Sequence, residues 1–259
     1  ERSFYFDFGM DGGARGELTT GADVYGHYWN NIGDQSVTSN RPSTDVVYSI
    51  VDADSTVTDI TVQLADTKFT ANGMSGGGGL LTPDAELLGD LAVATATEDY
   101  LFASNSEHCS VLISGLDANK GYQFKIFGSR VATDVRISDY TLRGDWAVQG
   151  ILQVAGSAIG ANGENTNTAN VWLSPVIHPA SDGTIRLTVH RNYADSSPYF
   201  PINCMRMQEM TDLHQADKSI YIDCGHSDGN NGEITAVPDA NGIYWVNLYD
   251  NAVSAEAVN

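Results

Sequence analysis

The sequence predicts an all-β fold, a jelly roll or other β-sandwich, followed by the beginning of a second copy of the same domain. Short segments rich in Val, Ile, Thr and Tyr recur along the chain, and turns rich in Gly, Asp and Asn separate them. Long helical segments that would connect parallel strands are missing from the pattern. A repeat of about 40 to 50 residues, which a propeller would show, is missing as well. Such a series of strands is typical of two packed sheets.

The expected strands follow one another through residues 1–210. Several alternate cleanly, and in 185–189 the apolar Ile185, Leu187 and Val189 share one face. The full set is 4–8, 45–51, 57–64, 100–103, 110–114, 122–127, 135–142, 146–154, 171–173, 185–189 and 199–207. Only 83–91 has the composition of a short helix.

An internal repeat predicts the domain organisation. Shifted by 216 positions, segment 3–37 matches segment 219–253 without a gap, with 15 identities in 35 positions. Chance would give about two. Several mismatches exchange one apolar residue for another, as Phe4 and Phe6 do with Ile220 and Ile222. We therefore expect a domain at 1–210, a linker at 211–218, and a partial second repeat at 219–259.

The charge excludes some partners. Asp and Glu number 33 against 13 Lys and Arg, for a formal net charge of −20. Such a surface repels nucleic acid and anionic lipid, and no apolar run reaches the roughly 20 residues of a membrane span. The surface tolerates neutral glycans and divalent cations. We expect an extracellular or cell-surface protein that neither binds nucleic acid nor inserts into a membrane.

Aromatic and amide side chains gather in the segment 25–31, which we expect to be a loop. Sugars stack their C–H faces on aromatic rings and hydrogen-bond with planar amides. Core packing is the competing interpretation for Trp29, because it recurs in the second copy as Trp245. The binding candidates here are Tyr25, Tyr28, Trp29, Asn30 and Asn31.

A second group of candidates lies further along the chain. Arg130 and Arg136 are close together although basic residues are scarce, so one of them could hold a sugar hydroxyl or carboxylate. The alternative is a buried ion pair with Asp134 or Asp139. Trp146, Tyr193 and Tyr199 are further stacking candidates.

Acidic residues near the first strand are candidates for calcium, which prefers hard oxygen ligands. They are Asp7, Asp11, Glu17 and Asp23, and Asp7, Glu17 and Asp23 have counterparts in the second copy. We expect any calcium here to be structural.

Catalytic motifs are not recognisable. A Gly-x-Ser-x-Gly elbow, a Gly-Asp-Ser segment and a glycine-rich phosphate loop are all missing, and no two histidines stand at i, i+4. A carboxylate pair for hydrolysis is compatible with so many acids, yet nothing distinguishes one pair. We therefore expect no catalytic residue in this chain.

A set of short motifs carries a resemblance to a known family. They are Phe-Asp-Phe-Gly near the start, Tyr-Trp-Asn-Asn, the segment 116–130 ending in Phe-Gly-Ser-Arg, and Pro-Ile-Asn-Cys-Met-Arg-Met. Their order resembles the galactose-binding-like jelly-roll domains attached to secreted polysaccharide esterases and glycosidases of Bacteroidetes. The resemblance implies an accessory carbohydrate-binding role, commonly with a structural calcium. The hydrolase domain of such proteins has no counterpart in this sequence.

Three functions remain open on these grounds. The first is a non-catalytic carbohydrate-binding module of a secreted or surface protein, with a polysaccharide or glycan as partner. The second is a structural or adhesive repeat of an extracellular filament or surface layer, which self-associates through 219–259. The third is a glycoside or ester hydrolase with an unrecognised acid pair.

Overall fold

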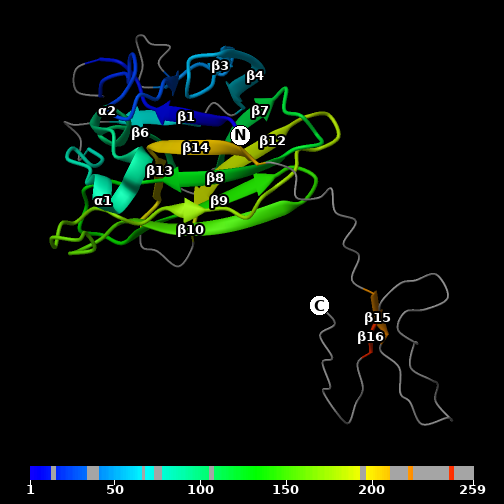
Figure 1. The fold of residues 1–259 in the computed structure, drawn as a ribbon. Coiled ribbons are helices and arrows are strands. Elements are labelled where there is room, and N and C mark those ends of the chain that lie inside the picture. Colours follow the sequence, from blue (N-terminus) through cyan, green and yellow to red (C-terminus); the bar gives the residue numbers. More distant parts are fainter. Residues whose placement is uncertain are drawn as a thin grey trace. The chain divides into compact units, whose positions relative to one another are not determined.

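The computed structural model describes residues 1–12, 16–33, 41–65, 68–72, 78–104, 108–192 and 197–210, and the backbone of two later strands. By its contacts the chain divides into two compact units, Glu1–Asp212 and Leu213–Asn259. Strands dominate the described part of the first unit, so the predicted all-β sandwich is confirmed (Figure 1). No helix among the described residues is long and apolar enough to cross a membrane.

The first layer of the sandwich is a five-stranded sheet of order β11-β8-β14-β1-β2. The first strand, β1, lies between an antiparallel and a parallel neighbour, β14 and β2. The bounds are β1 Ser3–Phe8, β2 Trp29–Ile32, β8 Gly121–Phe127, β11 Trp172–Leu173 and β14 Cys204–Met210.

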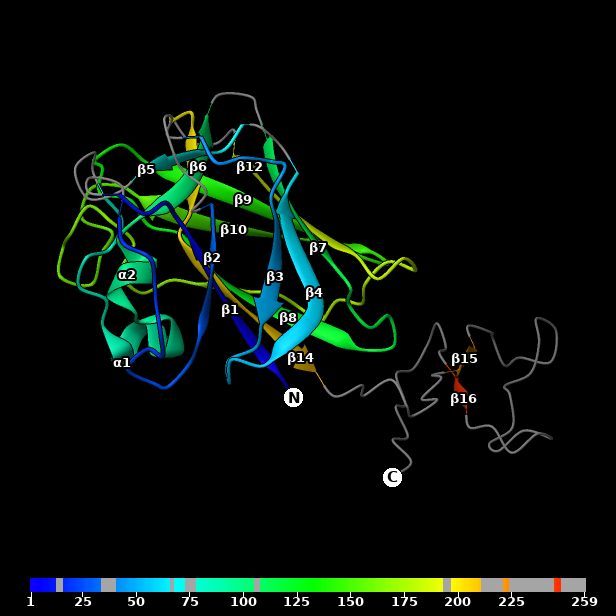
Figure 2. The same cartoon turned by 90° about the horizontal axis from the view of Figure 1, so that it is seen from above.

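The second layer is a six-stranded sheet of order β10-β9-β12-β7-β4-β3, and a three-stranded sheet of order β13-β6-β5 completes the unit. Figure 2 shows β3 and β4 beside β1, with β9, β10 and β12 further back. The bounds are β3 Val47–Val51, β4 Val57–Leu64, β5 Thr70–Asn72, β6 Tyr100–Ser104, β7 His108–Ser114, β9 Arg136–Arg143, β10 Ala147–Ala155, β12 Ile185–Arg191 and β13 Tyr199–Ile202.

The main core lies between the layers, and β1 shows how the sequence builds it. Phe4, Phe6 and Phe8 alternate along the strand and are fully buried in this core. Each buried phenylalanine contributes about 1.5 to 3 kcal/mol of hydrophobic stabilisation. Tyr5 and Asp7 point to the other face of the same sheet because successive side chains of a strand alternate.

The other face of β1 is covered by a short helical segment. It consists of α1 (Ala85–Leu88), the 3-10 helix η3 (Gly89–Leu91) and α2 (Ala94–Thr97), seen together on one side of β1 and β2 in Figure 2. Leu88, Leu91 and Ala96 pack there with Tyr5 and Trp29 in a second, smaller apolar cluster. Side chains on both faces of β1 are therefore buried.

Three elements differ from the sequence-based expectation. The segment beginning at Trp29 is a strand, β2, and β5 was not expected at all. The single strand expected at 199–207 is two strands in different sheets, β13 and β14, separated at Asn203. Asn203 is buried, and its Nδ2 donates to the carbonyls of Thr97 (2.9 Å) and Asp99 (2.7 Å), which fixes the break.

The second unit repeats one strand pair of the first. β15 (Tyr221–Asp223) and β16 (Trp245–Asn247) are parallel, with Tyr221 opposite Trp245. In the first unit Tyr5 lies opposite Trp29 in the parallel pair β1–β2. Each position differs by 216, so the sequence repeat and the strand register agree.

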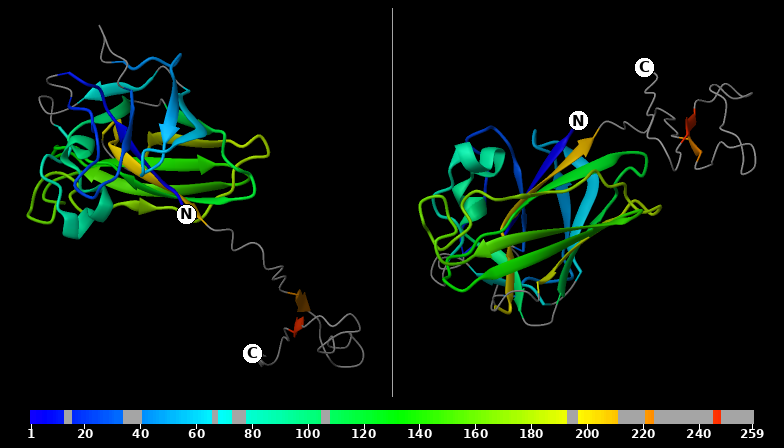
Figure 3. Two further views of the ribbon diagram at one scale, coloured as in Figure 1. Left: turned by 45° about the horizontal axis from the view of Figure 1, so that its top comes forward. Right: turned by 90° about the horizontal axis from the view of Figure 1, so that it is seen from below.

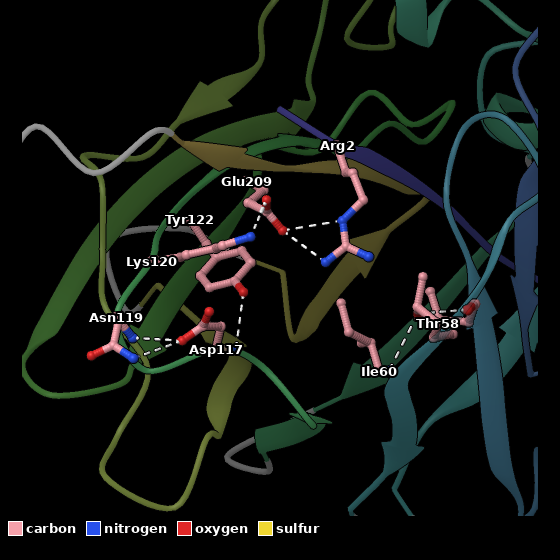
Figure 4. Close-up of polar contacts among 9 residues, drawn as sticks. Arg2, Thr58, Ile60, Asp117, Asn119, Lys120, Tyr122 and Glu209 are labelled. Carbon is pink, nitrogen blue, oxygen red and sulfur yellow. Dashed lines mark hydrogen bonds and ion pairs between the residues drawn. The ribbon is translucent and has the colours of Figure 1, made fainter.

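Both ends of the first unit's chain lie at the same end of its sandwich. β1 and β14 run antiparallel side by side, with Ser3 opposite Gln208 (Figure 3). At this end Glu209 accepts hydrogen bonds from Arg2 and from Lys120 Nζ (2.7 Å), beside Tyr122 (Figure 4).

Candidate functional site

Three of the five candidates in the segment 25–31 are structural. Trp29, Asn30 and Asn31 belong to β2, and the Trp29 ring is only 6% exposed, with its centroid 5.1 Å from that of Tyr5. Asn30 Nδ2 donates to the carbonyls of Tyr5 (3.0 Å) and Val51 (2.9 Å), which belong to different sheets. Trp29 is therefore not an exposed stacking surface, and Asn30 links the two layers.

The other two candidates, Tyr25 and Tyr28, lie on a tight turn and are 40% and 37% exposed. Asp23 holds this turn through both of its carboxylate oxygens. Oδ1 accepts from the backbone N–H of Tyr25 (2.8 Å) and of His27 (2.9 Å), and Oδ2 accepts from Trp29 Nε1 (2.7 Å). Both carboxylate oxygens of Asp23 therefore stabilise the turn, which is typical of aspartate in loops.

The second group of candidates forms a real cluster, which we call the arginine–tyrosine cluster: Arg130, Arg136, Tyr199, Tyr100 and Phe102. The Tyr199 ring contacts two guanidinium groups, with Arg136 Cζ 5.0 Å and Arg130 Cζ 5.8 Å from its centroid. Phe102 packs edge-on against Tyr199 and against Tyr100, each at 5.8 Å. Tyr199 remains 37% exposed, so part of a braced aromatic ring meets solvent.

Arg136 also forms the ion pair that the sequence left open, with Asp134 and not with Asp139. Its Nε and Nη2 donate to the two carboxylate oxygens of Asp134 at 2.9 and 3.2 Å. These hydrogen bonds lower the pKa of Asp134. Arg136 is 7% exposed and its Nη1 is buried without a hydrogen-bond partner among the described residues.

Arg130 is half-buried, and burial lowers the pKa of its guanidinium. Its Nη1 donates to the hydroxyl of Tyr100, which also accepts from Asn72 Nδ2 at 2.9 Å. Burial raises the pKa of Tyr100, so this hydroxyl stays neutral. The buried tyrosine thus fixes the guanidinium on one side of the cluster.

The cluster lies at the end of the sandwich opposite the chain ends. β8 and β14 are antiparallel, with Phe127 opposite Cys204 and Gly121 opposite Met210. Arg130 lies in the loop after Phe127, Arg136 begins β9 at the end of that loop, and β13 with Tyr199 leads into Cys204. Met210, at the other end of β14, lies a strand length from Cys204.

Trp146 does not join the cluster, and Tyr193 lies outside the described residues. Trp146 is 49% exposed in the turn between β9 and β10. Arg136 begins β9 and Arg143 ends it, so seven steps of about 3.3 Å put roughly 23 Å between these two ends. The candidates therefore do not form one continuous platform.

Tyr100 and Phe102 are cluster residues that sequence reasoning missed. They were assigned to an expected strand, where alternation places both on one face, but nothing indicated which loops that face would meet. Pairing of β6 with β13, Phe102 opposite Pro201, brings them to Tyr199. Only this long-range pairing assembles the cluster.

The four calcium candidates do not converge. Asp11 and Glu17 are exposed, and Asp23 serves the turn. Asp7 is 2% exposed; its Oδ2 accepts from Thr19 N (3.1 Å) and Thr19 Oγ1 (2.8 Å), while Oδ1 is buried without a partner in the described chain. Among the described residues, no three acidic, histidine or cysteine side chains form a group that could hold a metal ion.

Asp7 instead has two acidic neighbours that the sequence did not indicate, Glu98 and Asp99. Asp99 is 1% exposed; its Oδ2 accepts from Met10 N (3.3 Å) and its Oδ1 has no partner among the described residues. Burial raises the pKa of both aspartates, and the negative charge of Asp7 and Glu98 raises that of Asp99 further. A buried carboxyl of this kind is held neutral by a proton.

Two glycines make room for this carboxyl group. A Cβ atom on Gly9 or on Gly16 would overlap the carboxylate of Asp99. Both glycines recur in the second copy of the sequence, as Gly225 and Gly232. Glycine at positions 9 and 16 therefore provides the space that the Asp99 carboxyl group occupies.

Comparison with known proteins gives distant structural likeness alone. No protein-family model and no curated protein matches the chain. One similar structure is the module TmCBM61 in complex with β-1,4-galactotriose, 14% identical, covering 59% of this chain and 90% of the module with a TM-score of 0.27. These values assign no residue role to this chain.

Two further structures resemble it at a similar level. A plant receptor-like kinase, FER, is 10% identical over 85% of this chain and 44% of its own, with a TM-score of 0.41. A cleaved adhesin domain of Lys-gingipain from Porphyromonas gingivalis is 9% identical over 57% of this chain and 89% of its own, with a TM-score of 0.33.

Proposed function

We propose that the domain is a non-catalytic carbohydrate-binding module of a secreted or surface protein, and that it binds glycan at the arginine–tyrosine cluster. The partial exposure of Tyr199, 37% of the residue, is the observation that carries this proposal. Two guanidinium groups and Phe102 hold the ring in place, so a sugar can stack on it without ordering a mobile side chain.

The position of the cluster supports the same function. It lies at the end of the sandwich opposite Ser3 and Met210. Hydrogen-bond donors for sugar hydroxyls are at hand in the half-buried Arg130 guanidinium. A module of this kind raises the local concentration of a glycan for whatever domain it accompanies.

The test is a glycan array followed by calorimetry on the full chain, with Tyr199→Ala as the diagnostic variant. Tyr25→Ala is the matched control because Tyr25 is 40% exposed against 37% for Tyr199, and it lies on the Asp23 turn. We expect at least a tenfold loss of affinity with Tyr199→Ala and none with Tyr25→Ala. Loss with Tyr25→Ala alone would move the site to the Asp23 turn.

The repeated strand pair favours one second function, a structural repeat that assembles through 219–259. β15–β16 has the register of β1–β2, and β1 is a central strand that needs β14 beside it. Light scattering on the full chain and on a version ending at Met210 separates the two functions. Monomers in both cases support the binding module, whereas assembly of the full chain alone supports the structural repeat.

Calcium is a separate proposal. Asp7 Oδ1 and Asp99 Oδ1 are buried without partners among the described residues, so each is an oxygen that an ion could bind, although no group of three ligand side chains is found there. Thermal unfolding with EDTA and with millimolar calcium checks this. An unchanged Tm would show that these carboxyl groups are neutralised by protons only.

A further inference from the structure

Two arginines on the outer face of the six-stranded sheet lie side by side without a counter-charge. Arg186 of β12 is directly opposite Arg143 of β9, which puts their Cβ atoms about 5 Å apart. Both residues are exposed, and neither guanidinium has an ion-pair or hydrogen-bond partner in the described part of the chain. Like charges directly opposite each other destabilise a strand pair. A chain with 33 acidic and only 13 basic residues thus leaves two of its scarce cations in mutual repulsion.

The neighbouring strands supply no carboxylate in the same row. On its other side Arg143 has Ala147 of β10, and Arg186 has Leu112 of β7. Other basic side chains of the domain do have carboxylate partners, namely Arg2, Lys120, Lys125, Arg136 and Arg206. The missing counter-charge is therefore particular to this row.

The two acids nearest to Arg143 in the sequence form hydrogen bonds elsewhere. Asp139, earlier on β9, accepts from Asn192 Nδ2 at 2.8 Å. Asp145, in the turn after β9, accepts from the next backbone N–H at 2.8 Å. Among the described residues neither forms an ion pair with Arg143 or Arg186. The place between the two guanidinium groups is thus suited to an anion from outside the chain.

A row of hydroxyl and amide groups lies next to the arginines on the same face. Thr141 of β9 is opposite Thr188 of β12. Gln149 of β10 donates to Thr141 Oγ1 at 3.3 Å, and Ser110 Oγ of β7 is 3.2 Å from Thr188 Oγ1. These strands run side by side in the order β10, β9, β12 and β7 (Figure 2). The row supplies hydrogen bonds for sugar hydroxyls, whereas the centre of a protein interface is mainly apolar and depleted of charge.

We infer that this face binds a glycan through an anionic group, a carboxylate or a sulfate, that bridges Arg143 and Arg186. The planar fork of a guanidinium matches two oxygens of such a group, and charge-assisted hydrogen bonds of this kind are short and strong. A net charge of −20 repels polymers that are charged at every unit, so the ligand carries its anionic groups at intervals. The site lies at the other end of β9 from Arg136, and it does not depend on binding at the arginine–tyrosine cluster.

The experiment measures the binding of defined oligosaccharides to the full chain by calorimetry. One probe alternates glucuronate with a neutral sugar, a second carries sulfate at the same spacing, and a third is the carboxyl-reduced form of the first. We expect at least one anionic probe to bind about tenfold more tightly than the neutral one at low salt, and this advantage to shrink as salt is raised. Comparison of carboxylate with sulfate identifies the anionic group.

Variants locate the binding at the arginine pair. Arg143→Gln and Arg186→Gln should each remove most of the advantage, and Arg143→Lys should keep part of it because it retains the charge without the planar fork. Glu86→Gln, at an exposed position on α1, is the control for net charge. Combined with Arg143→Gln it returns the formal net charge to −20, and anionic binding should stay weak. Thermal unfolding confirms that the variants fold, because removal of one charge from a repelling pair should not lower the Tm.

Three outcomes would overturn the inference. Equal binding of the anionic and neutral probes refutes the anionic group, and recovery of binding in the combined variant shows that net charge and not the pair is responsible. Loss of anionic binding in Tyr199→Ala would move the anion to the arginine–tyrosine cluster. The glycan array that tests the cluster does not involve Arg143, so failure of this site and failure of the proposed function are told apart.

Discussion

Arg2 and Glu209 join the first and the last strand of the domain. Arg2 Nε and Nη2 donate to Glu209 Oε2 at 3.2 and 2.9 Å, and Glu209 N donates to the Arg2 carbonyl at 2.8 Å (Figure 4). Lys120 Nζ reaches the other carboxylate oxygen at 2.7 Å. The side chain of Glu209 is only 10% exposed, whereas those of Arg2 and Lys120 are 43% and 38% exposed.

Glu209→Gln should therefore destabilise the domain modestly. Two partly exposed ion pairs are lost, and such pairs contribute about 1 kcal/mol or less each. We expect a loss of about 1 kcal/mol in the free energy of unfolding by urea at pH 7. Glu86→Gln on the exposed face of α1 is the control and should be neutral. An equal loss in both variants would show that net charge, not this contact, matters.

The pH dependence of that contribution has a definite sign. The hydrogen bonds from Lys120 and Arg2 outweigh burial and lower the pKa of Glu209 in the folded state. A lowered carboxyl pKa stabilises the fold above the ordinary glutamate range, and the stabilisation is lost as pH falls through the folded value. The difference between wild type and Glu209→Gln should accordingly shrink below about pH 4.

Asp99→Asn should stabilise the calcium-free protein at neutral and alkaline pH. Because the pKa of Asp99 is raised in the folded state, that state holds a proton that the unfolded chain releases above the ordinary aspartate range. Stability of the wild type therefore falls as pH rises from about 4. Asparagine has the same shape without the charge, so we expect a gain of about 1 to 2 kcal/mol at pH 8. Urea unfolding in EDTA between pH 5 and 9 measures it, and a steeper pH dependence in the variant would contradict it.

Gly9→Ala should be strongly destabilising because its Cβ would overlap the carboxylate of Asp99. Such overpacking costs typically about 1 to 3 kcal/mol. The backbone of Gly9 is compatible with alanine, so the cost is steric and should largely vanish when Asp99→Ala opens the space. A double-mutant cycle of the two substitutions tests this. Additive losses would show that the overlap is relieved elsewhere.

Trp29→Phe should lower stability and leave glycan binding unchanged. The substitution removes the hydrogen bond from Trp29 Nε1 to Asp23 and reduces apolar contact with Tyr5. A loss of a buried hydrogen bond to a charged acceptor costs about 1.5 to 3 kcal/mol. Calorimetry with any glycan bound by the wild type should give the same affinity. A tenfold weaker interaction would return Trp29 to the binding site.

The sequence predicted those parts of the fold that local pattern determines. The alternation of Phe4, Phe6 and Phe8 gave β1, and that of Ile185 and Leu187 gave β12. β2 was not predicted because two of its four residues are asparagines, which are uncommon in strands. Its place beside β1 depends on hydrogen bonds from Asn30 to residues 21 and 25 positions away.

Three members of the candidate site, Arg130, Arg136 and Tyr199, were predicted as binding residues, but the sequence did not indicate that they lie together. Arg130 and Arg136 lie in one segment and stood out because basic residues are few. Asp99 gave no signal, because its burial depends on two glycines about 80 and 90 positions earlier in the chain. Trp29 was predicted as a binding residue because it lies among aromatic residues in an expected loop. It is instead buried in the smaller apolar cluster with Tyr5.

Because β1 and β14 pair in antiparallel fashion, the chain enters and leaves the domain at the same end, and this matters for a protein with several tandem copies of the domain. In each copy Tyr199 would lie at the end of the sandwich opposite the end where the chain enters and leaves. Under the proposed glycan-binding function, several copies could bind a single long polymer at several points, and weak individual contacts would then add up to avidity without any new contact surface. Strength of attachment would thus be set by the number of copies as much as by the affinity of one.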